Sequence, residues 1–191
     1  VFQGSPKRRH YNPLGTVLAT SPETLQIKGR TLTSTAVQDS LRTQGPVISQ
    51  AFMSTAGNLI IFLSQPIFSS QGDYLGAVGG SIYLKQESML DKLLGEHFYE
   101  DGSYLYVVDK AKRIIYHPQS QRVGDTVTGN QAIDQAVSGH SGRIAITNSQ
   151  GVPMLAGYAF VPSAGWGIVA QRPQSATLAP LDALMRTMLY K

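Results

Sequence analysis

The same order of elements occurs twice along the chain, and this repetition restricts the fold more than any other feature of the sequence. Each copy begins with an apolar strand pattern that ends at a proline, Ser-Pro at 21–22 and His-Pro at 117–118. A short helical pattern follows, over 34–44 in the first copy and 130–139 in the second, and each closes near a glycine, as helices commonly do. Two copies of one supersecondary unit therefore predict two similar modules.

Strand patterns follow each of these helices, over 46–84 and 142–173, and turn residues divide each run into three predicted strands. Strands joined so closely must pair antiparallel, because a parallel crossover needs a dozen or more residues. The predicted fold class is therefore α+β, with two modules that are each an antiparallel sheet flanked by helices.

Two further helices are predicted outside the sheets. One covers 85–102, where apolar residues recur at helical spacing; the other forms the end of the chain, with an apolar seam of Leu178, Leu181, Met185 and Met188. We expect a first module over 1–86, a second over 87–174 and an exit helix over 175–191. Residues 1–13 precede the first pattern and are interpreted either as a tag remnant or as a truncated helix.

The last strand, within 163–173, carries the one tryptophan of the chain between two glycines. Gly165 and Gly167 permit a sharp reversal, and Trp166 then starts a strand whose apolar centre predicts a middle position in the sheet. Pro173 ends the pairing immediately before the exit helix.

Composition excludes several classes of protein. With 42% hydrophobic and 15% charged residues in 191, the chain can bury a core. Three of the positive charges stand together at Lys7, Arg8 and Arg9, and no second basic cluster exists, so we expect no nucleic-acid partner. Cysteine is absent and the four histidines lack ligand spacing, so we expect neither a metal nor a cofactor. No run of about 18 apolar residues is present.

Catalytic motifs are also absent. The sequence has no Gly-x-Ser-x-Gly elbow, no phosphate loop and no His-Glu-x-x-His pair, and "GAVGGS" at 76–81 lies within a strand pattern. His117 follows a strand and precedes a proline, which favours a structural or pocket-lining role over catalysis.

Both predicted sheets are rich in aromatic and small polar residues, a composition typical of small-molecule clefts. The candidate ligand-binding residues are Ser49, Phe52, Phe62, Ser64, Tyr74 and Ser81 in the first module and Tyr104, Tyr106, His117, Tyr158 and Trp166 in the second. A filled aromatic core explains most of these residues nearly as well.

The sequence resembles the double Cache domain, the extracytoplasmic sensor of bacterial membrane receptors, which is built from two PAS-like modules. The resemblance rests on "GTVLATSP", "PVISQAF", "LIIFLSQPIFSSQGDYLGAVGGSIYL", "YLYVVDKAKRIIYHP", "VGDTV" and "GWGIVAQRP", over about residues 14–173. It implies a periplasmic domain of an inner-membrane protein, a homodimer in the intact receptor, and a membrane span after the last helix. The motifs "HP" and "GWGIVAQ" are most similar to those in sensors of diguanylate cyclases. The long helix that begins the family's pattern is missing here.

Ser81 marks a departure from the members of this family that bind amino acids. They resemble one another in an Arg followed by Trp-Tyr on the first module's helix and in an Asp that ends a "GGDI"-like strand. Here the helix reads "STAVQDSLRTQ" and the strand reads "GGSI". Both charged anchors of an amino acid are thus replaced, so we expect free α-amino acids to bind weakly or not at all.

The sequence therefore predicts a non-enzymatic module that senses a small molecule and transmits a conformational change to a cytoplasmic output, with diguanylate cyclase as the expected output. Two alternatives remain open at this stage: a structural dimerisation module without a ligand, and a hydrolase of unrecognised type.

Overall fold

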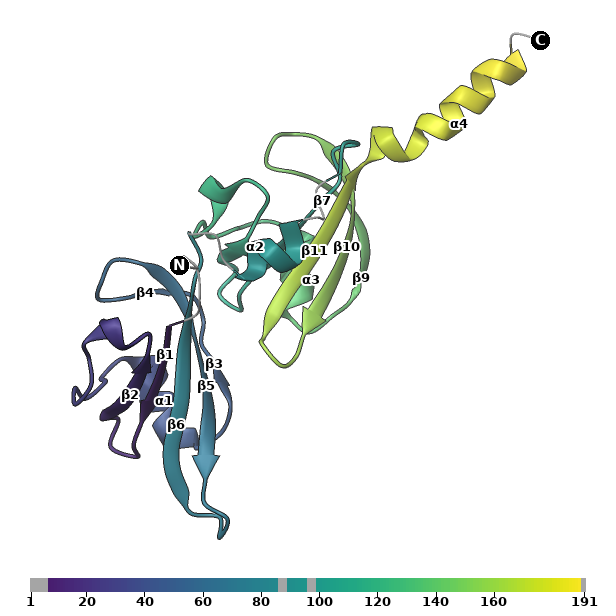
Figure 1. Cartoon of the computed structure of the whole chain (residues 1–191). Coiled ribbons are helices and arrows are strands. Elements are labelled where there is room, and N and C mark those ends of the chain that lie inside the picture. The colour runs from purple at the N-terminus through teal and green to yellow at the C-terminus, as the bar shows by residue number, and fades with distance from the viewer. Residues whose placement is uncertain (1–6, 86–88, 96–98, 190–191) are drawn as a thin grey trace. The chain divides into compact units, whose positions relative to one another are not determined.

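The computed structural model describes residues 7–85, 89–95 and 99–189, and the chain divides into two compact units, Val1–Met89 and Leu90–Lys191. Each unit holds one antiparallel sheet with helices packed on it (Figure 1). The predicted α+β class, with two PAS-like modules, is confirmed.

The sheet of the first unit has the strand order β2-β1-β6-β5-β3, with β4 also paired to β5. The strands are β1 (Lys7–Tyr11), β2 (Val17–Ser21), β3 (Val47–Ile48), β4 (Phe52–Met53), β5 (Leu59–Phe68) and β6 (Tyr74–Tyr83). The run that was predicted to hold three strands thus holds four, because the first of them is interrupted between β3 and β4. A short 3-10 helix, η1 (Glu23–Leu25), follows β2.

Within residues 1–13, which were interpreted as a tag remnant or a truncated helix, residues Lys7–Tyr11 form strand β1 and not a helix. It lies between β2 and β6, paired antiparallel to both. Tyr11 at its end is only 1% exposed. Charged residues fill most of the strand, so its burial pattern is hidden from a search for apolar alternation.

Helix α1 (Thr35–Thr43) packs on the sheet of the first unit and buries Ala36, Val37 and Ser40. Its left-handed C-terminal residue is Gln44, one position before the expected glycine. The Tyr11 hydroxyl lies 2.9 Å from Ser40 Oγ and 2.7 Å from Ser64 Oγ, and the two serine oxygens are 2.6 Å apart. These three hydroxyl groups satisfy one another inside the core.

The sheet of the second unit has the order β8-β7-β11-β10-β9. The strands are β7 (Tyr104–Val108), β8 (Ile114–Tyr116), β9 (Gly142–Thr147), β10 (Pro153–Val161) and β11 (Trp166–Pro173). The predicted middle position of the last strand is confirmed. Helix α3 (Gln131–Val137) packs on this sheet, and its first turn is capped by Asn130, whose Oδ1 accepts from the Ile133 N–H at 3.2 Å.

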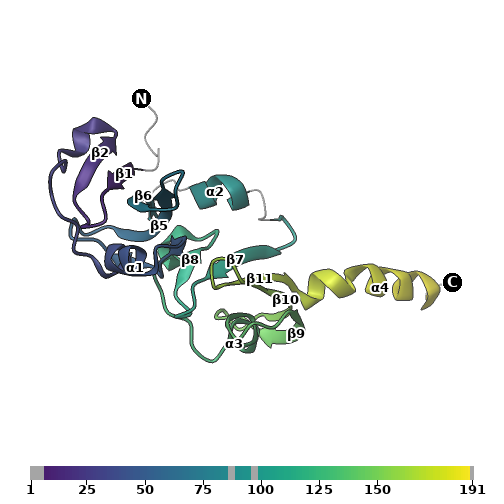
Figure 2. The same ribbon diagram turned by 90° about the horizontal axis from the view of Figure 1, so that it is seen from below.

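Two helices differ in extent from their predictions. Helix α2 (Met89–Leu94) covers only part of 85–102, and Phe98 lies outside the described residues. Helix α4 (Gln174–Leu189) begins immediately after β11, and both views show it projecting from the end of that strand (Figure 2). On its predicted seam Leu178 and Met185 are exposed. The side chains of Leu181 and Met188 lie outside the described residues.

Candidate ligand-binding site

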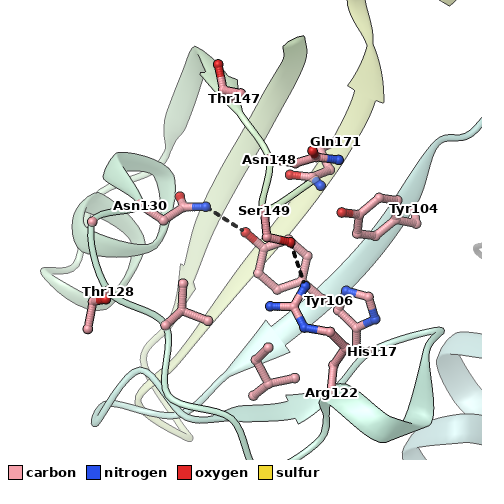
Figure 3. A pocket seen from close by; sticks show the side chains of 13 residues that line it. Tyr104, Tyr106, His117, Arg122, Thr128, Asn130, Thr147, Asn148, Ser149 and Gln171 are labelled. Atoms are coloured by element: carbon pink, nitrogen blue, oxygen red, sulfur yellow. Dashed lines mark hydrogen bonds between the residues drawn. The ribbon is translucent and has the colours of Figure 1, made fainter. Parts of the chain in front are cut away.

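A cavity of about 160 Å³ opens on the inner face of the second unit's sheet (Figure 3). Its walls come from β7, β11, the turn between β9 and β10, the segment before α3, and the short 3-10 helix η3 (Ser120–Arg122). The lining residues are Tyr104, Tyr106, Ile114, His117, Arg122, Val127, Thr128, Gly129, Asn130, Thr147, Asn148, Ser149 and Gln171.

The pairing of β7 with β11 determines which residues of the sheet face the cavity. Tyr104 of β7 lies opposite Gln171 of β11, and Tyr106 lies opposite Val169. Directly paired residues face the same side of a sheet, so both tyrosines and Gln171 share the face that α3 also covers. Strand β11, whose centre was predicted to be apolar, therefore also carries one inward polar residue, Gln171.

His117 follows β8 and is 5% exposed. Its Nδ1 accepts a hydrogen bond from the backbone N–H of Gln119 at 3.0 Å. The imidazole centroid lies 5.3 Å from that of Tyr104 and 5.8 Å from that of Tyr106. Burial, helped by the charge of Arg122 and opposed by Asp125, lowers the pKa of His117 to about 4. The side chain is therefore neutral at pH 7, with its proton on Nε2.

Arg122, at the end of η3, is the one cation among the lining residues in the described part of the chain. Its Nη1 donates to Ser149 Oγ at 3.0 Å, which ties η3 to the β9–β10 turn. Its Nε lies 3.6 Å from an Asp125 carboxylate oxygen, and that aspartate does not line the cavity. Asp125, outside the cavity, thus balances part of the charge of a guanidinium that also borders the cavity.

Tyr106 is buried, and its hydroxyl accepts from Asn130 Nδ2 at 3.4 Å. Burial raises the pKa of Tyr106 above its usual value, so the phenol stays protonated. Asn130 uses its other side-chain atom to cap α3. One residue therefore fixes both the start of the helix and the position of a lining hydroxyl.

Gln171 carries the least satisfied polar atom of the cavity. The residue is 4% exposed, and its Oε1 is buried without a hydrogen-bond partner. A buried acceptor left unpaired costs about 1–3 kcal/mol. A donor within the cavity, whether a water molecule or a guest, would satisfy this atom.

Three of the predicted residues of the second module, Tyr104, Tyr106 and His117, meet in this cavity. Tyr158 is half-buried and packs against the hydrophobic core, and Trp166 is half-buried at the start of β11. Neither lines the cavity. Sequence analysis missed Arg122, Asn130 and Gln171. The one available signal for Gln171 was its position two residues after Val169, which places both side chains on the same face of the strand.

The first-module candidates lie in or beside a packed core. Phe62, Ser64 and Ser81 are buried, and Phe52 packs at the edge of the core. Ser49 Oγ accepts from the Phe62 N–H at 2.9 Å and donates to the Gln50 carbonyl at 2.8 Å. Tyr74 has a buried hydroxyl without a partner, and burial raises its pKa. Their role in binding stays a prediction.

The first unit nevertheless holds a cation that sequence analysis did not expect. Arg9 of β1 points along the inner face, with Nη2 3.5 Å from Ser81 Oγ. Its Nε is buried without a partner, and burial lowers its pKa below the usual value. Arg9 is therefore a half-buried cation beside Ser81 in the first unit.

Across 7–85, 89–95 and 99–189, no three His, Cys, Asp or Glu side chains gather as metal ligands. None of the helices described is long and apolar enough to cross a membrane.

The fold defines an α+β protein of two PAS-like modules, the second of which holds a small polar cavity. A profile described as Cache domain (dCache_1) matches residues 11–181, and the chain belongs to this family. No curated protein matches the chain.

Solved structures with the same fold come from several receptors. An extracellular ligand-binding receptor from Desulfohalobium retbaense matches with a TM-score of 0.65 at 16% identity, covering 87% of this chain and 30% of that one. The ligand-binding domain of the amino acid chemoreceptor PctC of Pseudomonas aeruginosa, in complex with GABA, matches with a TM-score of 0.60 at 18% identity, covering 87% and 73%. The periplasmic sensory domain of the Campylobacter jejuni chemoreceptor Tlp1 matches with a TM-score of 0.63 at 14% identity, covering 93% and 75%.

Proposed function

We propose that this chain is the extracytoplasmic sensor domain of a membrane receptor and that its second unit binds a small molecule. Membership of the Cache family supports the sensor role. The observation that carries the site is the cavity on β7 and β11, in which Gln171 Oε1 is buried without a partner while Arg122 offers a charge.

The cavity favours binding over catalysis. The lining residues in the described part of the chain include no carboxylate that would orient His117 as a base. The Nδ1 of that imidazole is occupied by a backbone N–H, and its low pKa makes it a poor proton acceptor at pH 7. The hydrolase alternative therefore has no supporting geometry at this site.

The position of Gln171 also supports a route for the signal. It stands three residues before Gln174, the first residue of α4, with no loop between them. A ligand that shifts β11 therefore acts on a helix joined to it without a flexible connection. We propose that the modules 1–86 and 87–174 sense the ligand, that 175–191 is the exit helix leading to a membrane span, and that the intact receptor is a homodimer.

The output domain is a separate proposal. The motifs "HP" and "GWGIVAQ" are similar to those of diguanylate cyclase sensors, which favours a cyclase. Solved structures of the same fold include sensory domains of a chemoreceptor and of a protein described as a histidine kinase, which favours one of these outputs. Determining the residues that follow 191 in the intact gene product decides between these outputs.

The proposed function is tested by titrating the purified chain with a library of small metabolites in a calorimeter. We expect at least one compound to bind the wild type and to lose affinity in Val127→Phe, which fills the cavity wall. Leu155→Phe, at an exposed position on β10 that does not line the cavity, is the matched control and should bind normally.

Other outcomes contradict the proposal in different ways. If no compound binds, the structural dimerisation role gains support. If binding survives Val127→Phe and is lost in Arg9→Gln, the ligand lies in the first unit and the site is misplaced.

A further inference from the structure

The charge of the cavity in the second unit points to an anionic guest. Arg122 is its cation, with 27% of the side chain exposed, and the lining residues that the structure describes include no acid. A carboxylate matches the planar fork of a guanidinium, which can bind its two oxygens together. An ammonium group would meet the positive charge of Arg122, and no carboxylate among the lining residues that the structure describes would pair with it.

A second contact is set by Gln171. Its Oε1 has no partner within the protein and can accept from a donor of the guest, and a hydroxyl group supplies one without adding charge. His117 adds a third contact, because its Nδ1 is occupied and its remaining N–H, on Nε2, is free to donate to a carboxylate oxygen.

The size of the cavity limits the guest. About 160 Å³ is well below the roughly 300–1,000 Å³ of pockets that hold drug-sized ligands. The guest is therefore expected to be smaller than a drug-sized ligand.

We infer that the second unit binds a short-chain hydroxycarboxylate, with the carboxylate on Arg122 and His117 and the hydroxyl on Gln171. This inference rests on the proposed function and narrows it to one chemical class. It also separates the chain from receptors of amino acids, because the hydroxyl takes the place that an ammonium group would need.

The test compares four compounds of nearly equal size by calorimetry on the purified chain: lactate, propionate, lactamide and alanine. Lactate should bind. Propionate lacks the hydroxyl and should bind roughly tenfold more weakly or worse, because Gln171 is left unpaired. Lactamide lacks the charge and alanine adds an ammonium, so both should bind at least tenfold more weakly than lactate.

Two variants locate these contacts. Gln171→Leu should reduce the lactate-to-propionate affinity ratio to about one while keeping carboxylate binding. Arg122→Gln should weaken lactate at least tenfold, whereas Arg143→Gln, an exposed arginine on β9, should leave it unchanged. The fluorescence of Trp166 checks that each variant is folded.

The outcomes distinguish this inference from the proposed function. If library compounds of another class bind in the cavity but lactate does not, or if alanine binds as well as lactate, the hydroxycarboxylate assignment is wrong and the sensor role stands. If no compound binds at all, both are wrong. A ratio unchanged in Gln171→Leu refutes the hydroxyl contact.

Discussion

Replacing His117 by asparagine should remove a specific part of the pH dependence of stability. The folded side chain is neutral because burial lowers its pKa to about 4, whereas the unfolded chain has a histidine pKa of about 6.5. Between these two values the unfolded state binds the extra proton. The contribution is therefore fully favourable above pH 6.5 and is lost as the pH falls towards 4.

The magnitude follows from the width of that window. Between pH 6.5 and pH 5 the loss is about 1.4 kcal/mol per pH unit, which amounts to about 2 kcal/mol. The charged and titratable neighbours of the imidazole are Arg122, Asp125, Tyr104 and Tyr106. His117→Asn leaves all four in place.

The assay is urea unfolding at pH 7 and pH 5, followed by the fluorescence of Trp166, the one tryptophan in the chain, which reports on the second unit. The wild type should lose about 2 kcal/mol more than His117→Asn between these pH values. The exposed His140, replaced by glutamine, is the control and should behave as the wild type does. Equal losses in wild type and His117→Asn would show that His117 titrates normally and that the cavity wall is wetter than described.

Three further changes test other parts of the structure. Gly79→Ala should destabilise the first unit by roughly 1–3 kcal/mol, because its new Cβ would lie 2.6 Å from the Phe62 ring. Gly45→Ala is the control and should leave stability unchanged, because the nearest atom to its new Cβ is 3.7 Å away. Urea unfolding followed by far-UV circular dichroism compares the two variants. Tyr11→Phe should cost only about 1 kcal/mol in the same assay, since Ser40 and Ser64 continue to bond each other; a loss of several kcal/mol would contradict this. One residue inserted after Pro173 in the full-length receptor should rotate α4 by about 100° and change basal output, and unchanged output would make the helix a passive tether.

The two-module fold could be predicted from the sequence because its signals are local. Turn residues, an apolar centre for β11 and the helical stretches at 35–43 and 131–137 all stand in short segments. Strand β1 could not be predicted in this way. Its inward residues are Lys7, Arg9 and Tyr11, so its burial depends on partners in β6 some 70 residues away.

The cavity shows the same limit more clearly. Tyr104, Tyr106 and His117 could be predicted because aromatic residues on a short hairpin are conspicuous. Arg122 and Gln171 are brought together only by the pairing of β7 with β11 and by the position of η3. Neither belongs to a motif, and the unpaired state of Gln171 Oε1 is a property of the folded chain alone.

The central claim, that a ligand in the second unit acts on the exit helix, is tested most directly by nuclear magnetic resonance of the ¹⁵N-labelled chain. The tightest-binding compound of the library screen is added stepwise, and the amide signals of Gln119, Gln171 and Gln174 are followed. Gln119 donates to His117, Gln171 lines the cavity, and Gln174 begins α4. All three signals should shift and saturate with one common dissociation constant. Shifts at Gln119 and Gln171 with Gln174 unmoved would show binding without transmission, and shifts confined to the first unit would contradict the account altogether.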